Sequence, residues 1–546
     1  MSWRSRTYDE LPALSIRRTH LRRSLRTVTV AWMFGIVWMA LVCGDQTRIL
    51  GNMLGMEDAH FSILTGLSFL ATVGQFLAVI LIERTGLRKY QFMEFAAIGR
   101  LLWLGVAAIP MVFLLPSRGA VAAMMLILFA SSFCDALATP AWMSWMAHLI
   151  PRRVRGRYFS VRARLTQYVQ IVTVIAAGAL LDYVTAPHAT GDPVTAQNQP
   201  ELLRAVRILF VVAAVFGVMD ILLFRGIREV VPTLRQPARP APASLAMLVA
   251  PLKDRVFRHY VLFYATLTFS NAVGGWFYWK NCRENLGLSS LATSILFLAL
   301  TPLIQILCSR WWGRIIDRWG RRPVLFVGGL GVLLCMVPYL IASPYIGNPA
   351  FLADGINAVA RPFGGAVNWT ARLCGARGDV VGLAWVDYQT PISSFLIILS
   401  AVIVGGIAWM GVNLAQTAIV LGFAEGQGRS NYVAASSFFI SVGGLVGAGV
   451  AAVATYFLNG LHDAPIRLGP LLWNGWHIMF LLAMAARVFS FYWLKGMPEP
   501  SSGSVGNLLR YVWTSLYGNV ANAVSFPLRV FGWRPAGEGR NRDARD

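Results

Sequence analysis

The chain has 546 residues, of which 56% are hydrophobic and only 13% are charged. A soluble globular protein carries about 25% charged residues, so the composition excludes an ordinary water-soluble domain. The formal net charge of +23 can indicate a nucleic-acid-binding protein. The positions of the basic residues favour a membrane surface instead, and we expect no nucleic-acid partner.

Long uncharged runs recur along the chain, among them 61–82, 391–424 and 432–462. A helix needs about 20 apolar residues to cross a bilayer, and an open strand edge cannot be left in lipid. The sequence therefore predicts an all-α membrane protein with twelve transmembrane helices. The predicted spans are 27–48, 60–82, 91–114, 119–149, 158–184, 202–225, 258–281, 289–312, 322–343, 391–422, 431–458 and 470–494.

Most of the 48 Lys and Arg residues fall in alternate connections between these spans. If both termini are cytoplasmic, these connections all lie in the cytoplasm, as the positive-inside rule requires. The arginine-rich segment 1–26 leads into a full span rather than a cleavage site. We therefore expect a multi-pass inner-membrane protein with both termini cytoplasmic, whose basic loops contact anionic lipid.

The predicted spans form two halves, 27–225 and 258–494. A cytoplasmic linker at 226–257, rich in Pro, Ala and Arg at its centre, joins them. The second half carries an external insertion at 344–390 with many Gly and Pro residues. The tail 495–546 contains a mixed apolar and aromatic stretch, which predicts an interfacial helix; a partly disordered tail is the alternative.

Two connections carry an acid, glycines and bases in a similar order. One lies between predicted spans eight and nine, and the other between spans two and three. The segments 155–158 and 427–432 give a second internal match, and the insertion accounts for their larger separation. The motif residues are Gly313, Asp317, Arg318, Gly320, Arg321 and Arg322 in the second half, and Glu83, Arg84, Gly86 and Arg88 in the first.

These motifs resemble the signature loops of the Major Facilitator Superfamily (MFS). The first-half copy departs from the pattern, because Glu83 replaces the usual Asp and Val79 stands where Gly is expected. The segments 140–145 and 155–159 are similar to those of a bacterial subgroup. The resemblance implies the MFS fold, with two six-helix bundles related by pseudo-two-fold symmetry.

The resemblance also implies a cytoplasmic gate built from these motif residues. Asp317 would face the start of span five near Tyr158, and Glu83 would face the start of span eleven near Ser430. A helix N-terminus favours a negative charge, so such contacts would close the cytoplasmic side. The alternative is that the motif arginines only set topology.

Ionisable residues inside predicted spans usually mark function. Arg100 and Asp135 lie at depths where they could meet, either as a structural ion pair or with a coupling or substrate role for Asp135. Asp45, near the external end of span one, is a candidate for an external vestibule. Asp220 and Arg487 are expected to snorkel to the interface.

By the resemblance, spans one, four, seven and ten line a central cavity. We expect a secondary active transporter that moves a small solute by alternating access, with proton coupling as one option. The alternative is a solute receptor on the same fold. No nucleotide-binding loop is present, and we expect a monomer without enzymatic activity, metal or cofactor. The candidate substrate or coupling residues are Asp45, Arg100, Asp135, Trp142, Asn271, Asn413 and Gln416.

Overall fold

The computed structural model confirms a helical membrane protein. It describes residues 18–85, 87–150, 152–185, 199–227, 249–373, 391–423, 429–458, 460–463, 465–469, 471–495, 497, 506 and 508. Within these ranges, eleven helices are long and apolar enough to cross a membrane. A further helix, α11 (Arg255–Gly274), has 20 residues and a more polar composition, and it occupies the place of predicted span seven.

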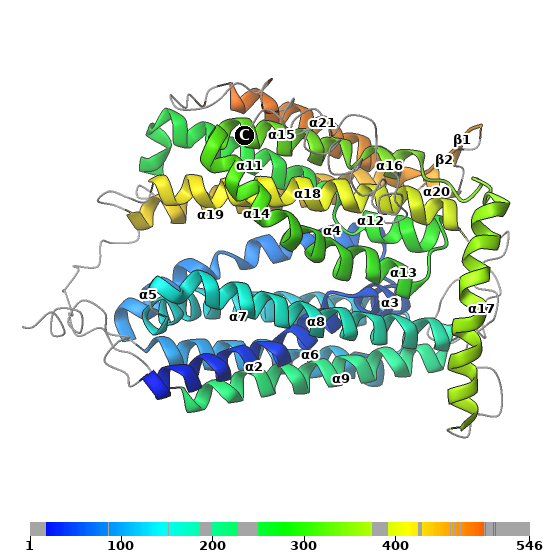
Figure 1. Ribbon diagram of the computed structural model, residues 1–546, viewed down its shortest axis with the longest axis horizontal. Helices are drawn as coiled ribbons and strands as arrows, with labels where there is room; N and C mark the ends of the chain where they lie inside the picture. The colour runs from blue at the N-terminus through cyan, green and yellow to red at the C-terminus, as the bar shows by residue number, and fades with distance from the viewer. Residues whose placement is uncertain are drawn as a thin grey trace, which may run out of the picture.

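The first bundle lies in the lower half of Figure 1. Ser117 caps the start of α7 by accepting a hydrogen bond from Ala120 N, and the rings of Trp103 and Phe210 pack 5.3 Å apart in the bundle core. The helices are α2 (Arg18–Val42), α4 (Asp58–Ala71) with α5 (Gly74–Thr85), α6 (Arg88–Val112), α7 (Arg118–Leu149), α8 (Arg152–Thr185) and α9 (Pro200–Leu223).

The second bundle lies in the upper half of Figure 1. Asp254 caps α11, and the buried helix α11 packs between α19 and α21. Short α13 (Ser290–Ser294) continues through η6 (Ile295–Leu300) into α14 (Thr301–Trp319). The other helices are α15 (Arg321–Leu334) with α16 (Val337–Ile341), α18 (Ile392–Phe423), α19 (Arg429–Leu458) and α21 (Gly475–Leu494).

The bundles meet along two helix pairs, α4 with α19 and α8 with α13 and η6. A Cβ atom added at Gly178 would lie 2.7 Å from the Leu291 Cα atom, so only glycine permits this approach. Gln170 Nε2 also donates to Leu298 O across the interface at 2.9 Å. The two bundles are therefore closely packed where α8 meets the start of predicted span eight.

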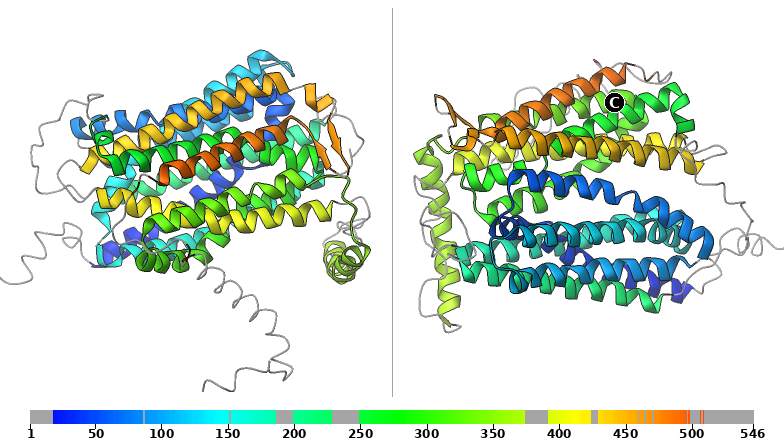
Figure 2. Two further views of the ribbon diagram at one scale, coloured as in Figure 1. Left: turned by 90° about the horizontal axis from the view of Figure 1, so that it is seen from above. Right: turned by 180° about the vertical axis from the view of Figure 1, so that it is seen from behind.

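One end of the molecule is covered by α17 (Ala350–Leu373), which runs across the ends of both bundles (Figures 1 and 2). We call this the α17 end. It also holds α3 (Asp45–Leu54) and the antiparallel hairpin of β1 (Ile466–Leu468) and β2 (Leu471–Trp473). The sequence predicted an insertion here but not its helix.

Two predicted spans are broken by glycines near the α17 end. Span one ends at Val42, and Gly44 precedes the separate helix α3. Span seven ends at Gly274, because Gly275 has φ +28° and redirects the chain into α12 (Phe277–Lys280). The predicted 1–26 and 495–546 tails and the 226–257 linker fall mostly outside the described residues.

Candidate functional site

A buried acid joins the two bundles at the α17 end. Asp45 is 0% exposed and accepts a hydrogen bond from Arg48 Nε at 2.6 Å within its own bundle. From the second bundle, Trp279 Nε1 donates to Asp45 at 2.8 Å, Arg283 Nε lies 3.0 Å from its Oδ2 atom, and Ser290 Oγ donates to it. Asp45 thus binds three groups of the opposite bundle instead of lining an open vestibule.

Two more acids extend this contact. Glu284 Oε1 accepts from Arg48 Nη1 at 2.8 Å and from Asn52 Nδ2 at 2.9 Å. Asp58 pairs with Lys280 and accepts from Trp476 Nε1, both on the second bundle. We call this set the interbundle lock; it comprises Asp45, Arg48, Asn52, Asp58, Trp279, Lys280, Arg283, Glu284, Ser290 and Trp476.

Asp182, near the end of α8, adds a contact of another type. Its two carboxylate oxygens accept from Ser290 N at 2.7 Å and Leu291 N at 2.9 Å. These are the first N–H groups of the helix that begins at α13, where negative charge is favoured. This is the kind of contact that the resemblance implied for the other end, and the sequence analysis did not single out Asp182.

Asp45 lies beyond the end of α2, and its pKa reflects its neighbours. Burial by itself would raise the pKa of the carboxyl group, but the Arg48 and Arg283 guanidinium groups and the hydrogen bonds from Arg48 and Ser290 hold the pKa below its usual range. Asp45 therefore stays ionised at any pH near neutrality.

The opposite end lacks a comparable contact at Asp317. This side chain is exposed and, among the described residues, has no hydrogen bond or ion pair. A Cβ atom added at Gly313 would meet nothing within 4 Å, so none of the described helices approaches closely there. Gly320 takes φ +84° between α14 and α15, which explains why the motif needs a glycine at this turn.

The first-half motif falls largely outside the described part of the chain, which leaves out Gly86 and the side chains of Glu83 and Arg84. The predicted gate contacts therefore stay predictions. The remaining motif residues, Arg88, Arg318, Arg321 and Arg322, lie at the same end as Asp317.

A cavity of about 540 Å³ is lined by the first bundle and, from the second, by Ile306 of α14. Arg100 lies in its wall, with Nη1 3.2 Å from Asp135 and Nη2 3.2 Å from Asp220. Arg100 and Asp135 thus meet, as their predicted depths allowed, and the contact fits both a structural ion pair and a coupling role. The expectation that Asp220 snorkels is wrong: the residue is 1% exposed, because the nearby guanidinium group compensates its charge.

Several polar atoms of this cavity have no hydrogen-bond partner in the described part of the chain. They are Trp38 Nε1, Arg100 Nε and Asp220 Oδ1, all buried. Arg162 lies over the rings of Trp32 at 4.9 Å and Trp142 at 5.0 Å, so the predicted Trp142 belongs to the same wall. Buried polar atoms without partners cost free energy, and a polar solute in this cavity could supply the missing hydrogen bonds.

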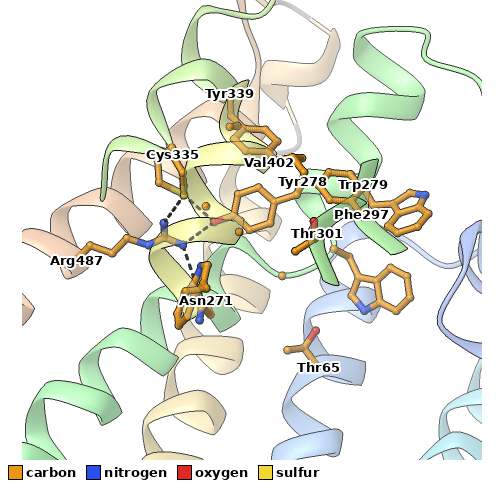
Figure 3. A pocket seen from close by; sticks show the side chains of 17 residues that line it. Thr65, Asn271, Tyr278, Trp279, Phe297, Thr301, Cys335, Tyr339, Val402 and Arg487 are labelled. Atoms are coloured by element: carbon orange, nitrogen blue, oxygen red, sulfur yellow. Dashed lines mark hydrogen bonds between the residues drawn. The ribbon is translucent and has the colours of Figure 1, made fainter. Parts of the chain in front are cut away.

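A second cavity, of about 450 Å³, lies in the second bundle (Figure 3). Arg487 in its wall donates from Nε to Ser270 Oγ at 2.9 Å, and from Nη2 to Asn271 Oδ1 at 3.0 Å and Tyr278 Oη at 3.3 Å. Arg487 is only 3% exposed. The expectation that it snorkels is also wrong, because neutral groups inside the bundle satisfy its donors.

The predicted polar residues of spans seven and ten separate in the structure. Asn271 lines the second cavity. Asn413, which is exposed, and Gln416, which is half-buried, lie on α18 and line neither cavity.

The short segment after Gly275 connects the second cavity with the interbundle lock. Tyr278 bonds to Arg487 in the cavity, Trp279 bonds to Asp45, and Lys280 pairs with Asp58. Trp279 also lines the cavity itself. Three consecutive residues therefore link Arg487 to the lock.

Two helical bundles with internal cavities and a bonded interface at one end define a membrane carrier. The family model of the Major Facilitator Superfamily matches residues 24–388, and the chain belongs to this superfamily. Membership supports a secondary transporter rather than the receptor alternative. No curated protein sequence matches the chain.

Solved structures of similar fold are transporters. The nucleoside transporter NupG matches with a TM-score of 0.56 and 11% identity, over 87% of this chain and 99% of that chain. The xylose transporter XylE from E. coli in an inward open conformation matches with a TM-score of 0.52 and 14% identity, over 90% of this chain and 99% of that chain. A bacterial homologue of the human lysosomal transporter Spinster, in an inward-facing and occupied conformation, matches with a TM-score of 0.54 and 13% identity. The match covers 89% of this chain and 100% of that chain.

Proposed function

We propose that the chain is a secondary active transporter of the inner membrane that moves a small solute by alternating access, with the α17 end facing outward and both termini in the cytoplasm. The interbundle lock is the observation that carries the proposal. It holds the outer end shut by contacts between bundles, and such contacts can break and reform as the bundles rock.

The solute would bind between the bundles, at the walls of the two cavities. In the first bundle the candidate groups are Arg100, Asp135 and Asp220, and in the second Asn271 and Arg487. A charged cluster inside a membrane protein is expensive and usually serves transport, so Asp135 and Asp220 are the candidate coupling acids. The proposal includes the coupling of solute transport to proton binding at these two acids.

The state of the gate fits this cycle. With the outer end locked, the contact implied for Asp317 is not made, as expected of a conformation that opens toward the cytoplasm. Two solved structures of similar fold, the Spinster homologue and a bacterial homologue of the iron transporter ferroportin, are in inward-facing states, which supports this assignment.

Cysteine labelling tests the proposal without knowledge of the substrate. Thr139 is exposed and lines the first-bundle cavity. In a background without native cysteines, Thr139→Cys should react with a membrane-impermeant maleimide in inverted vesicles but only weakly in right-side-out vesicles. Lys253→Cys, exposed beside the start of α11, is the matched surface control and should react only in inverted vesicles.

Adding Asp45→Asn should slow the reaction of Thr139→Cys in inverted vesicles, because breaking the lock shifts the population toward a state closed on the cytoplasmic side. The Lys253→Cys rate should not change. Equal labelling of Thr139→Cys from both sides, or a rate independent of Asp45→Asn, would contradict alternating access.

A further inference from the structure

We propose that the second-bundle cavity binds the anionic group of an organic solute, a carboxylate held by Arg487 with an apolar or aromatic body against the ring-lined wall. This inference rests on the proposed transport function and adds a substrate class to it. The observation behind it is a buried positive charge that no acid of the described chain compensates.

Arg487 contacts neutral groups only. Its guanidinium group donates to Ser270, Asn271, Tyr278 and the carbonyl of Val332, and lies 3.7 Å from the Cys335 sulfur. No Asp or Glu among the described residues lies within 4.0 Å of it. An uncompensated charge inside a membrane protein is costly, and an incoming anion would recover part of this cost.

The buried arginine of the first bundle shows the contrast. Arg100 is neutralised by Asp135 and Asp220, each 3.2 Å away. An anion near Arg100 would meet two carboxylates, whereas an anion near Arg487 meets hydroxyl, amide and sulfur groups. Of these two arginines, Arg487 is therefore the one that can bind a carboxylate without repulsion.

The rest of the cavity fits an aromatic or apolar body. Trp276, Trp279, Phe297, Tyr339 and Trp409 contribute rings to the wall, and in Figure 3 the Tyr278 ring lies between Arg487 and the side chains of Trp279 and Phe297. A volume of about 450 Å³ lies within the range of small-molecule sites. Charged hydrogen bonds between arginine and a carboxylate are stronger than those to neutral acceptors, so an incoming carboxylate would replace some of the neutral acceptors that now bind Arg487.

Binding can be measured on the full chain in nanodiscs by its tryptophan fluorescence. The probes are 3-phenylpropionate, its neutral amide and the cationic 3-phenylpropylamine, which share the ring and differ in charge. Wild-type protein should bind the carboxylate at least about tenfold more tightly than the amide, and the amine most weakly. Equal affinity for carboxylate and amide, or binding of neither, would overturn the proposal.

Variants locate the effect. Arg487→Gln should abolish the preference for the carboxylate, while Arg487→Lys should retain part of it. Arg207→Gln is the matched control, because Arg207 is a half-buried arginine of α9 that donates to Ala107 O and lines neither cavity. A carboxylate preference that survives in Arg487→Gln contradicts the assignment. If that variant does not fold, the relative affinities of the three probes for wild-type protein still test whether the cavity prefers an anion.

An anionic lipid headgroup is the other source of a negative group. The titration is therefore made in phosphatidylcholine nanodiscs with and without phosphatidylglycerol. If phosphatidylglycerol leaves the affinity for 3-phenylpropionate unchanged, the result supports a soluble solute. If the lipid competes fully with the probe, the proposal is overturned. The titration measures binding alone. A negative titration therefore leaves the labelling test of the transport cycle intact, and a negative labelling result leaves the titration intact.

Discussion

The two ends of the molecule differ in how the bundles meet. At the α17 end, Asp45, Asp58 and Glu284 each bond across the bundle boundary, and Asp182 caps a helix of the opposite bundle. At the other end, Asp317 is exposed and has no polar partner among the described residues. Both ends carry acids, but among the described residues only the acids at the α17 end bond across the boundary, as expected of one conformation of a two-state carrier.

Loss of the central acid should have the largest effect on this difference. Asp45→Asn leaves the buried Arg48 and the half-buried Arg283 without their shared counter-ion, and breaking a buried pair costs about 3–5 kcal/mol. The thermal unfolding midpoint of the purified protein should fall clearly. Glu201→Gln is the control, because the Glu201–Arg204 pair is largely exposed and such pairs contribute about 0–1 kcal/mol. Equal midpoints for the two variants would refute the lock.

The helix-end contact should matter less. Asp182→Asn keeps an oxygen acceptor for Ser290 N or Leu291 N but removes the negative charge at the helix start. Interactions of a charge with a helix end contribute about 0.3–1 kcal/mol, and up to about 2 when partly buried. We expect a midpoint shift smaller than that of Asp45→Asn. A larger shift would mean that Asp182, rather than Asp45, is the centre of the closed end.

Acidification sharpens the comparison further. The pKa of Asp45 is depressed in the folded protein, so its contribution to stability is present above the ordinary Asp value of about 3.9 and is lost only as pH falls through the lower folded value. Between pH 7.5 and 5 the reaction rate of a cysteine at Ser289, beside the lock, should not change once thiol ionisation is corrected with the Lys253→Cys control. A rise across this window would show that the lock titrates.

The smallest effect on stability is expected at the other end. Asp317→Asn removes a charge that has no polar partner among the described residues, so the unfolding midpoint should stay within the change of about 0.5 kcal/mol that is usual for surface substitutions. If Asp317 stabilises the alternate state, the variant should still raise the labelling rate of Thr139→Cys. A large loss of midpoint would show that Asp317 already has a structural role here.

The sequence predicted the helical class, the two halves and most spans, because apolar length and the positions of basic residues determine how a chain inserts in a membrane. It also placed Arg100 and Asp135 at matching depth. It missed the helix of the insertion, where glycine and proline suggested loop, and the breaks at Gly44 and Gly275, since a single glycine inside an apolar run does not mark a turn by itself.

The candidate site was harder to predict. Asp220 and Arg487 look alike in sequence, as single charges in apolar spans, and both were assigned to the interface. Their burial depends on partners from other helices, namely Arg100 for the first and Asn271 and Tyr278 for the second. Lock residues on separate bundles, such as Asp45 and Trp279, are likewise brought together only by the tertiary fold.

Distances at both ends, measured in one protein, test the central claim most directly. Spin labels at exposed Arg118 and Tyr345 report on the α17 end, and labels at exposed Thr85 and Arg314 report on the other. In wild-type protein the α17-end pair should give one short distance. Asp45→Asn should add a population in which this distance lengthens while that of the second pair shortens. Lengthening at the α17 end without shortening at the other would contradict alternating access.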